Sequence, residues 1–212
     1  LRPSPAAEPR DLLRNLRAAM RIAASRLGDA GLEWLAGGMP VPGLPLGGHI
    51  HVSGVFLDAD LVRALDNYLA LPLALLEDDG SRRRRPRYGA LGDIRRQFHG
   101  GFEYRTLPSW IVSPSVALGV LTLAKVVCEE ARALRERPLA RPEVQAMYYA
   151  GDKAGLLPAA LKVWDDLERT DAYARYAKEL DKLKERILRM KSWDAARDVR
   201  AAWRVAAPQG AR

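Results

Sequence analysis

Two of the chain's three histidines lie two positions apart in the stretch GGHIHVSG, at His49 and His51. The alternation of polar and apolar residues from His49 to Val52 is typical of a short, half-buried β-strand. Because residues two apart on a strand face the same side, the two imidazoles are expected on one surface and the two apolar side chains on the other. An imidazole is a good ligand for a divalent metal and a good hydrogen-bonding partner for phosphate.

A second stretch, FEYR, alternates apolar and charged residues in the same way. The spacing predicts a strand in which Glu103 and Arg105 share the face opposite Phe102 and Tyr104. A carboxylate suits a hard cation such as Mg²⁺, and a guanidinium suits the oxygens of a phosphate. Together with the histidine strand, this pattern predicts one surface for metal and phosphate. The alternative for each strand alone is an ordinary polar solvent face, where an E-x-R pair contributes little stability.

A segment rich in arginine and glycine, residues 79–101, lies between the two strands. We expect a long loop here, and loops of that length in compact domains are usually functional or disordered. Its arginines are candidates for phosphate binding, and its glycines allow close approach of the backbone to a ligand. A solvated basic loop is the alternative. A zinc hydrolase is less well supported, since zinc sites usually have three or four protein ligands and only His99 remains.

The composition sets limits on the class of protein. With 212 residues, 48% of them hydrophobic, the chain can bury one substantial core. The net charge of +8 favours anionic partners without choosing between ATP and nucleic acid. A single cysteine, Cys128, excludes an intrachain disulfide and fits a cytoplasmic protein. No apolar run is long enough to predict a membrane span.

Helical patterns surround the two predicted strands. Apolar spacing predicts a helix over Pro9–Leu27, and a mostly apolar helix capped by Asp58 or Asp60 with a kink at Pro72. A serine-proline cap predicts another helix from the start of SPSVALGVLTLAKVVCEEARALRER. The pattern is helical from Arg141 to the end of the chain.

The ordered motifs GGHIHVSG, RRPRYGALGDIRR and FEYRTLPSW resemble the carboxylate-amine ligases of the glutamine synthetase and glutamate-cysteine ligase superfamily, and above all their phage and bacterial type 2 group. The likeness covers residues 47–110, and the opening LRPSPA is similar to the continuation of a family strand. The resemblance implies an α+β fold whose antiparallel sheet holds ATP and Mg²⁺ or Mn²⁺ on its concave face, with helices packed behind. Residues 1–140 would be the C-terminal part of the catalytic domain, and residues 141–212 a helical extension of that domain.

The activity implied by the resemblance is ATP-dependent formation of an amide bond. ATP would phosphorylate the carboxylate of a small molecule or peptide, and an amine would attack the acyl phosphate. By the same resemblance, His49 and Glu103 match metal ligands, and His51 matches a histidine that contacts nucleotide or phosphate.

The resemblance also assigns roles to three arginines. Arg105 matches an arginine that binds phosphate, and Arg87 and Arg95 match arginines that engage phosphate or the substrate carboxylate. Related sites use further glutamates from strands that would precede Leu1. We therefore expect the chain to be the C-terminal part of a longer enzyme, or to need a partner that completes the site.

Two other classes of function stay open. One is a basic module that binds nucleic acid through SRRRRPR and the lysine-rich helix of residues 172–191, although there is little aromatic interleaving and no recognition motif. The other is a noncatalytic relative of the ligase fold. The oligomeric state is open as well, since the helix of residues 172–191 suits either a core or an interface.

Overall fold

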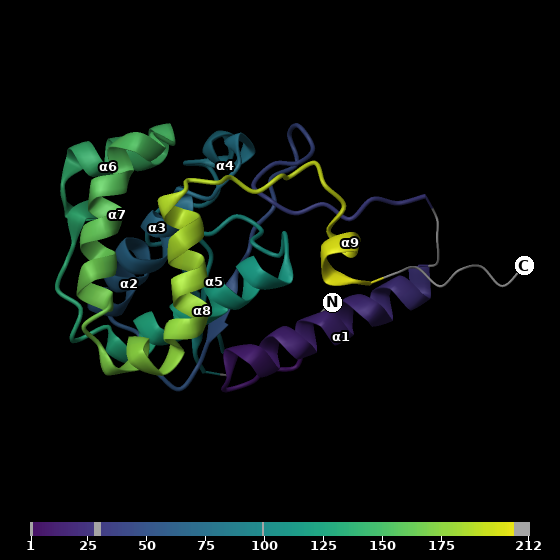
Figure 1. Ribbon diagram of the computed structural model, residues 1–212, viewed down its shortest axis with the longest axis horizontal. Helices are drawn as coiled ribbons and strands as arrows, with labels where there is room; N and C mark the ends of the chain where they lie inside the picture. The colour runs from purple at the N-terminus through teal and green to yellow at the C-terminus, as the bar shows by residue number, and fades with distance from the viewer. Residues whose placement is uncertain (1, 28–30, 99, 206–212) are drawn as a thin grey trace, which may run out of the picture.

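The computed structural model describes residues 2–27, 31–98 and 100–205, and it has the α+β architecture expected from the sequence (Figure 1). His99 lies outside the described residues. The strands are β1 (Ile50–Val52), β2 (Ile94–Arg96) and β3 (Phe102–Tyr104). The helices are α1 (Pro9–Leu27), α2 (Ala59–Leu65), α3 (Leu71–Ala74), α4 (Asp79–Arg84), α5 (Pro114–Glu130), α6 (Pro142–Ala150), α7 (Lys153–Leu167), α8 (Asp171–Leu188) and α9 (Val199–Trp203).

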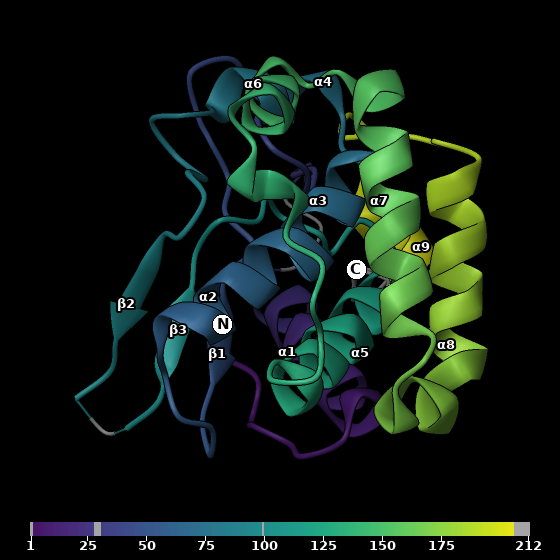
Figure 2. The ribbon, with the colours of Figure 1, turned by 90° about the vertical axis from the view of Figure 1, so that its left-hand side faces the viewer.

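The small sheet lies at one side of the molecule, and α7 and α8 lie at the opposite side (Figure 2). Helices α2, α3 and α5 fill the space between them, and α1 packs against α5. The strands are antiparallel in the order β1-β3-β2, so that the last strand in the sequence is the central one. One side of the sheet therefore faces the helices, and the other side is free to carry polar residues.

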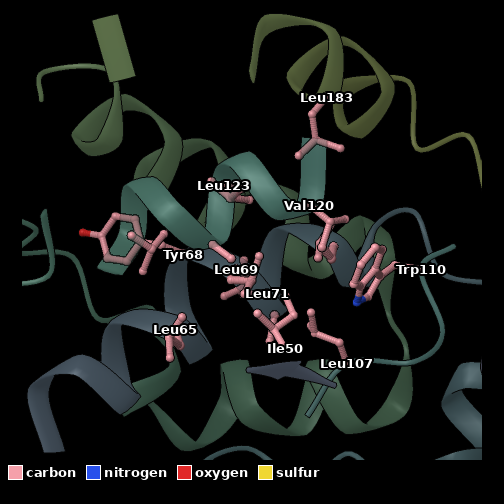
Figure 3. Packing of buried hydrophobic residues seen from close by; sticks show 14 of the residues in the cluster. Ile50, Leu65, Tyr68, Leu69, Leu71, Leu107, Trp110, Val120, Leu123 and Leu183 are labelled. Atoms are coloured by element: carbon pink, nitrogen blue, oxygen red, sulfur yellow. The ribbon is translucent and has the colours of Figure 1, made fainter. Parts of the chain in front are cut away.

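The hydrophobic core lies behind the sheet. Ile50, Phe102 and Tyr104 are buried on this side, as the alternation in both strands predicts. Figure 3 shows Ile50 pointing toward Leu71 from α3, with residues of α5 farther back. The sheet is thus anchored to the helices through its apolar face.

Three helix starts confirm the sequence patterns. Helix α1 has the predicted bounds, Pro9–Leu27. Asp58 caps α2 by accepting a hydrogen bond from the Leu61 N–H at 2.8 Å. Ser113 caps α5 by accepting one from the Val116 N–H at 3.3 Å, with Pro114 in the first turn. No helix within the described ranges has the length and apolar character that crossing a bilayer requires.

The expected loop over residues 79–101 is wrong in part, because this segment contains α4 and β2. Asp78 starts α4 by accepting a hydrogen bond from the Gly80 N–H. Strand β2 pairs with β3 in antiparallel register. The pairing partner of β2 follows it closely in sequence, yet the short polar strand IRR carries too little alternation to be recognised alone.

The expected kink at Pro72 is replaced by a wider helical turn. Residues Asp66–Ala70 form a π-helical turn in which the Leu71 N–H donates to the Asp66 carbonyl. Helix α3 starts immediately afterwards and has Pro72 in its first turn. Since proline has no N–H to donate, the extra residue of the π turn accommodates it without breaking the helical path.

The helical pattern expected from Arg141 to the end is interrupted between α8 and α9. Met190 adopts a positive φ of 45° just after α8. The buried Trp193 then donates its backbone N–H to the Leu76 carbonyl at 3.0 Å and its indole N–H to Asp78 at 2.7 Å. These contacts hold the segment between α8 and α9 in a non-helical conformation. They come from residues far away in the sequence, so the helical periodicity of the segment cannot predict them.

Candidate active site

Glu103 lies at the centre of the polar side of the sheet. It is the middle residue of β3, and the pairing places His51 of β1 opposite it on one side and Arg95 of β2 on the other. We call this side the front face. Its members come from the three strands and the residues flanking them: His49, His51, Asp93, Arg95, Gln97, Glu103 and Arg105.

The two oxygens of the Glu103 carboxylate have separate partners. Oε1 is 2.6 Å from His49 Nδ1 and 3.8 Å from His51 Nε2. Oε2 is 2.6 Å from a terminal nitrogen of Arg95 and accepts a weaker hydrogen bond from the Gln97 amide at 3.4 Å. Only 3% of the Glu103 side chain is exposed. The structure therefore places both predicted metal ligands, His49 and Glu103, in direct contact. It also shows that Arg95 and Gln97 are the partners of Oε2.

The surroundings keep Glu103 ionised. Burial alone would raise the pKa of its carboxyl group, since a charged group loses hydration inside a protein. The hydrogen bonds and charges of His49 and Arg95 act in the opposite direction and prevail, so the pKa of Glu103 lies below its usual value. An ionised carboxylate next to an imidazole is a donor pair that divalent cations accept.

Arg105 lies beside Asp93 at the end of the front face. The Arg105 backbone N–H donates to the Asp93 carbonyl at 2.8 Å, and the two side chains form a longer ion pair at 3.7 Å. About a third of each side chain is exposed. Arg105 thus shares the face of Glu103, as the period of the strand predicts, and its guanidinium is accessible to an anion.

Arg84 and Arg85 do not form an exposed phosphate-binding surface. Arg84 is buried and donates to the Thr106 carbonyl at 2.9 Å, which fixes the chain just beyond β3. Arg85 is buried in an ion pair with Glu77 and donates to the Tyr148 carbonyl at 2.7 Å. Two of the four consecutive arginines therefore support the fold, and SRRRRPR is not a continuous basic stripe for nucleic acid.

Arg87 is exposed in the turn that follows α4. Its guanidinium lies 5.6 Å from the centre of the Tyr88 ring. Across the part of the chain that the structure describes, no hydrogen bond or ion pair connects Arg87 to the front face. Of the three predicted arginines, Arg95 and Arg105 contact other residues of the front face, whereas Arg87 makes no hydrogen bond or ion pair with the described members of that face.

The two glycines before His49 make room for the site. A β-carbon on Gly47 would lie 2.4 Å from the His49 Nε2 atom, so the imidazole rests against this glycine. A β-carbon on Gly48 would lie 2.2 Å from the Pro108 carbonyl oxygen. Real β-carbons essentially never approach other atoms so closely, so Gly48 is required for steric reasons, whereas a side chain at position 47 would force the His49 ring to move.

The geometry of His49 and Glu103 is compatible with a divalent cation. Octahedral Mg²⁺ has ligands at about 2.1 Å, so neighbouring ligand atoms lie about 3 Å apart. The Nδ1–Oε1 distance of 2.6 Å needs to open by only a few tenths of an ångström. Among the described residues, no group of three or more acidic, histidine or cysteine side chains is placed to hold a metal. A cation here would take its other ligands from water and substrate, as Mg²⁺ commonly does.

Asp93 and Gln97 are members of the front face that the sequence motifs did not single out. Both are two residues from Arg95, one on each side of it in the sequence. Once β2 is recognised as a strand, the same two-residue period places all three on one side. The signal was therefore present but depended on recognising β2.

Comparison with known proteins identifies the family. A family model described as Phage phiEco32-like COOH.NH2 ligase-type 2 matches residues 1–205. The chain belongs to this family. The resemblance carried by the three motifs is thereby confirmed, and a carboxylate and an amine are the substrates that the family implies for this COOH-NH2 ligase. No curated protein and no solved structure matches the chain.

Proposed function

We propose that this COOH-NH2 ligase forms an amide bond at the front face at the expense of ATP. The γ-phosphoryl group of ATP passes to a substrate carboxylate oxygen, giving ADP and an acyl phosphate. The amine nitrogen then attacks the acyl carbon, the C–O bond to phosphate breaks, and inorganic phosphate leaves with loss of a proton from nitrogen. The observation that supports this proposal most is the buried, ionised Glu103 between His49 and Arg95.

His49 and Glu103 are the proposed ligands for Mg²⁺ or Mn²⁺. A divalent cation bound there would neutralise the charge that develops on the phosphate oxygens. The family membership, the short Nδ1–Oε1 distance and the lowered pKa of Glu103 support the assignment. Glu103 stays deprotonated at neutral pH, so the carboxylate is ready to bind without losing a proton.

The other charged side chains are proposed to bind the substrates. His51 is 61% exposed and next to Glu103, which suits a contact with a nucleotide phosphate. Arg105 is proposed to bind the transferred phosphoryl group, and Arg87 and Arg95 to engage phosphate or the substrate carboxylate. Phosphoryl transfer depends mainly on positioning and charge neutralisation, which is what such side chains supply.

The domain arrangement is also a proposal. We infer that residues 1–140 carry a glutamine synthetase-like catalytic part and that residues 141–212 extend the same domain. In support, one hydrophobic core contains residues from both segments, including Val120 of α5 and Leu183 of α8. Gly119 faces Leu183 so closely that a β-carbon would lie 3.0 Å from it.

Trapping the intermediate tests the proposed reaction. The purified chain is incubated with Mg²⁺, ATP, hydroxylamine and a panel of amino acids and short acidic peptides, and hydroxamate and ADP are measured. We expect both products to require an added carboxylate. Glu103→Gln should reduce the rate about 100-fold or more, because it removes a charge from the phosphoryl-transfer site. Arg96→Gln removes a charge from the same strand as Arg95 and should keep the rate. ADP release without any carboxylate, or a fully active Glu103→Gln, contradicts the proposal.

A further inference from the structure

Arg95 forms an ion pair with one carboxylate oxygen of Glu103, which is proposed to bind the cation. Its terminal nitrogen is 2.6 Å from Glu103 Oε2, while His49 contacts Oε1. Arg95 thus serves as a counter-ion of a carboxylate that is only 3% exposed.

The two members of this ion pair differ in their freedom to move. The Arg95 side chain is 60% exposed and comes from β2, an edge strand of the sheet. An exposed arginine can leave a single ion pair at little cost, because water solvates the released guanidinium. Among the described residues, Oε2 of Glu103 has no charged partner besides Arg95, because His49 and His51 lie beside Oε1. A buried carboxylate that loses a positive partner is disfavoured, so the release of Arg95 is favoured when another positive charge replaces it.

We propose that Arg95 is an exchangeable counter-ion, which rests on the proposed cation site at His49 and Glu103. When the divalent cation binds these two residues, repulsion from the cation releases Arg95 from Glu103. The guanidinium then pairs with a phosphate oxygen of the nucleotide that arrives with the cation. Arg95 is thus a positioning residue that holds Glu103 ready before binding and strengthens nucleotide binding afterwards.

Neighbouring groups favour this exchange. Gln97 also donates to Oε2 and keeps this oxygen hydrogen-bonded when Arg95 leaves. His51 and Arg105 lie on the same face, so a phosphate held there would be close to several positive or hydrogen-bonding groups. The exchange makes cation binding and nucleotide binding mutually dependent. The cation releases Arg95 to pair with the nucleotide, and the nucleotide keeps Arg95 away from the carboxylate that binds the cation.

The diagnostic property of the exchange is that one variant changes two affinities in opposite directions. Arg95→Gln removes the competitor for Glu103, so the affinity for Mn²⁺ alone should rise about fivefold. The same variant removes a phosphate partner, so the affinity for Mn²⁺ with ATP should fall about tenfold. A residue that only supports the fold would not raise one affinity while lowering the other.

The experiment titrates the full chain, freed of metal by chelation, with Mn²⁺ alone and with Mn²⁺ and ATP, using electron paramagnetic resonance for free Mn²⁺ and calorimetry for heat. Arg96→Gln is the matched control, because Arg96 is an exposed arginine of the same strand that pairs opposite Phe102 and not Glu103. It should change both affinities less than twofold. Arg95→Lys keeps the charge and should keep the Mn²⁺ affinity near that of the unaltered chain.

The outcomes separate the exchange from the proposed function. If Glu103→Gln abolishes Mn²⁺ binding and Arg95→Gln fails to raise it, the cation site stands and the exchange is overturned. If Glu103→Gln binds Mn²⁺ like the unaltered chain, the cation site itself is wrong and the exchange fails with it. If only Arg95→Gln gains measurable Mn²⁺ binding, the exchange is supported. Thermal unfolding followed by circular dichroism verifies that each variant is folded.

Discussion

Glu103 and Asp66 lie on opposite sides of the central strand β3, and both carboxylates are buried. Glu103 faces His49 and Arg95 on the front face. Asp66 lies in the π-helical turn behind the sheet, where it accepts hydrogen bonds from the Tyr104 hydroxyl at 2.8 Å and the Gly92 N–H at 3.0 Å. The partners of Glu103 include cations, and those of Asp66 are neutral.

The pKa values follow this difference. Burial raises the pKa of Asp66 to about 6, and the hydrogen bonds from Gly92 and Tyr104 offset only part of the effect. Burial acts on Glu103 in the same direction, but the charges beside it bring its pKa below the usual value. Burial alone therefore does not determine the charge of a carboxylate. The front face keeps an ionised carboxylate, and the rear face joins the strand to the core.

The largest effect on stability is expected from the rear face. Phe102→Ala removes a fully buried ring and should lower the free energy of unfolding by about 3–5 kcal/mol. Glu103→Gln, at the next residue, should lower it much less, because His49 and Arg95 are exposed enough to be solvated by water. Urea denaturation measures both. A greater loss of stability in Glu103→Gln than in Phe102→Ala would show that the front face also holds the fold together.

The pH dependence of stability should have opposite signs on the two sides. Asp66 binds a proton more tightly in the folded chain than in the unfolded one, so its contribution to stability is present below pH 4 and is lost as the pH rises to about 6. The loss is about 3 kcal/mol for a pKa change of about two units. Glu103, with its lowered pKa, contributes stability at neutral pH that is lost as the pH falls.

Comparing Asp66→Asn with the unaltered chain isolates the contribution of Asp66 to the pH dependence of stability. Unfolding free energies are measured by urea at several pH values between 4 and 7. The unaltered chain should lose stability relative to Asp66→Asn as the pH rises through this range. A constant difference across the range would mean that Asp66 titrates with an ordinary pKa in the folded chain.

The smallest expected effects come from the adjacent glycines. Gly48→Ala places a methyl group against the Pro108 backbone and should lower the free energy of unfolding by about 1–3 kcal/mol. Gly47→Ala meets the His49 ring, which can turn aside, so stability should change less while the affinity for Mn²⁺ falls. Melting temperatures and Mn²⁺ titrations distinguish the two. Unchanged Mn²⁺ binding in Gly47→Ala would remove His49 from the proposed cation site.

The parts of the fold that the sequence predicts are those governed by local periodicity. Helix α1 has its predicted bounds because its apolar residues recur at helical spacing, and β1 and β3 have strict two-residue alternation. The burial of Arg85 was not predictable in this way. Its partners Glu77 and Tyr148 come from the connection between α3 and α4 and from α6, and charge alone places an arginine on the surface.

The candidate site divides in the same manner. The two-residue period of a β-strand predicts that His49 and His51 share a face, and that Glu103 and Arg105 share a face. The contact between Arg95 and Glu103 depends on the pairing of β2 with β3, and β2 is too short and too polar to be recognised as a strand beforehand. Cross-strand partners are therefore the part of the site that needs the three-dimensional structure.

The spatial order β1-β3-β2 has a consequence for folding. The outer strands β1 and β2 do not pair with each other. Both pair only with β3, which is the last of the three along the chain. During synthesis, β1 and β2 consequently have no sheet to join until Phe102–Tyr104 has emerged, and the pairing of Val52 with Phe102 closes a long loop. The three strands that carry the front face should assemble in one cooperative event, so a nascent chain that stops before β3 contains no partly formed front face.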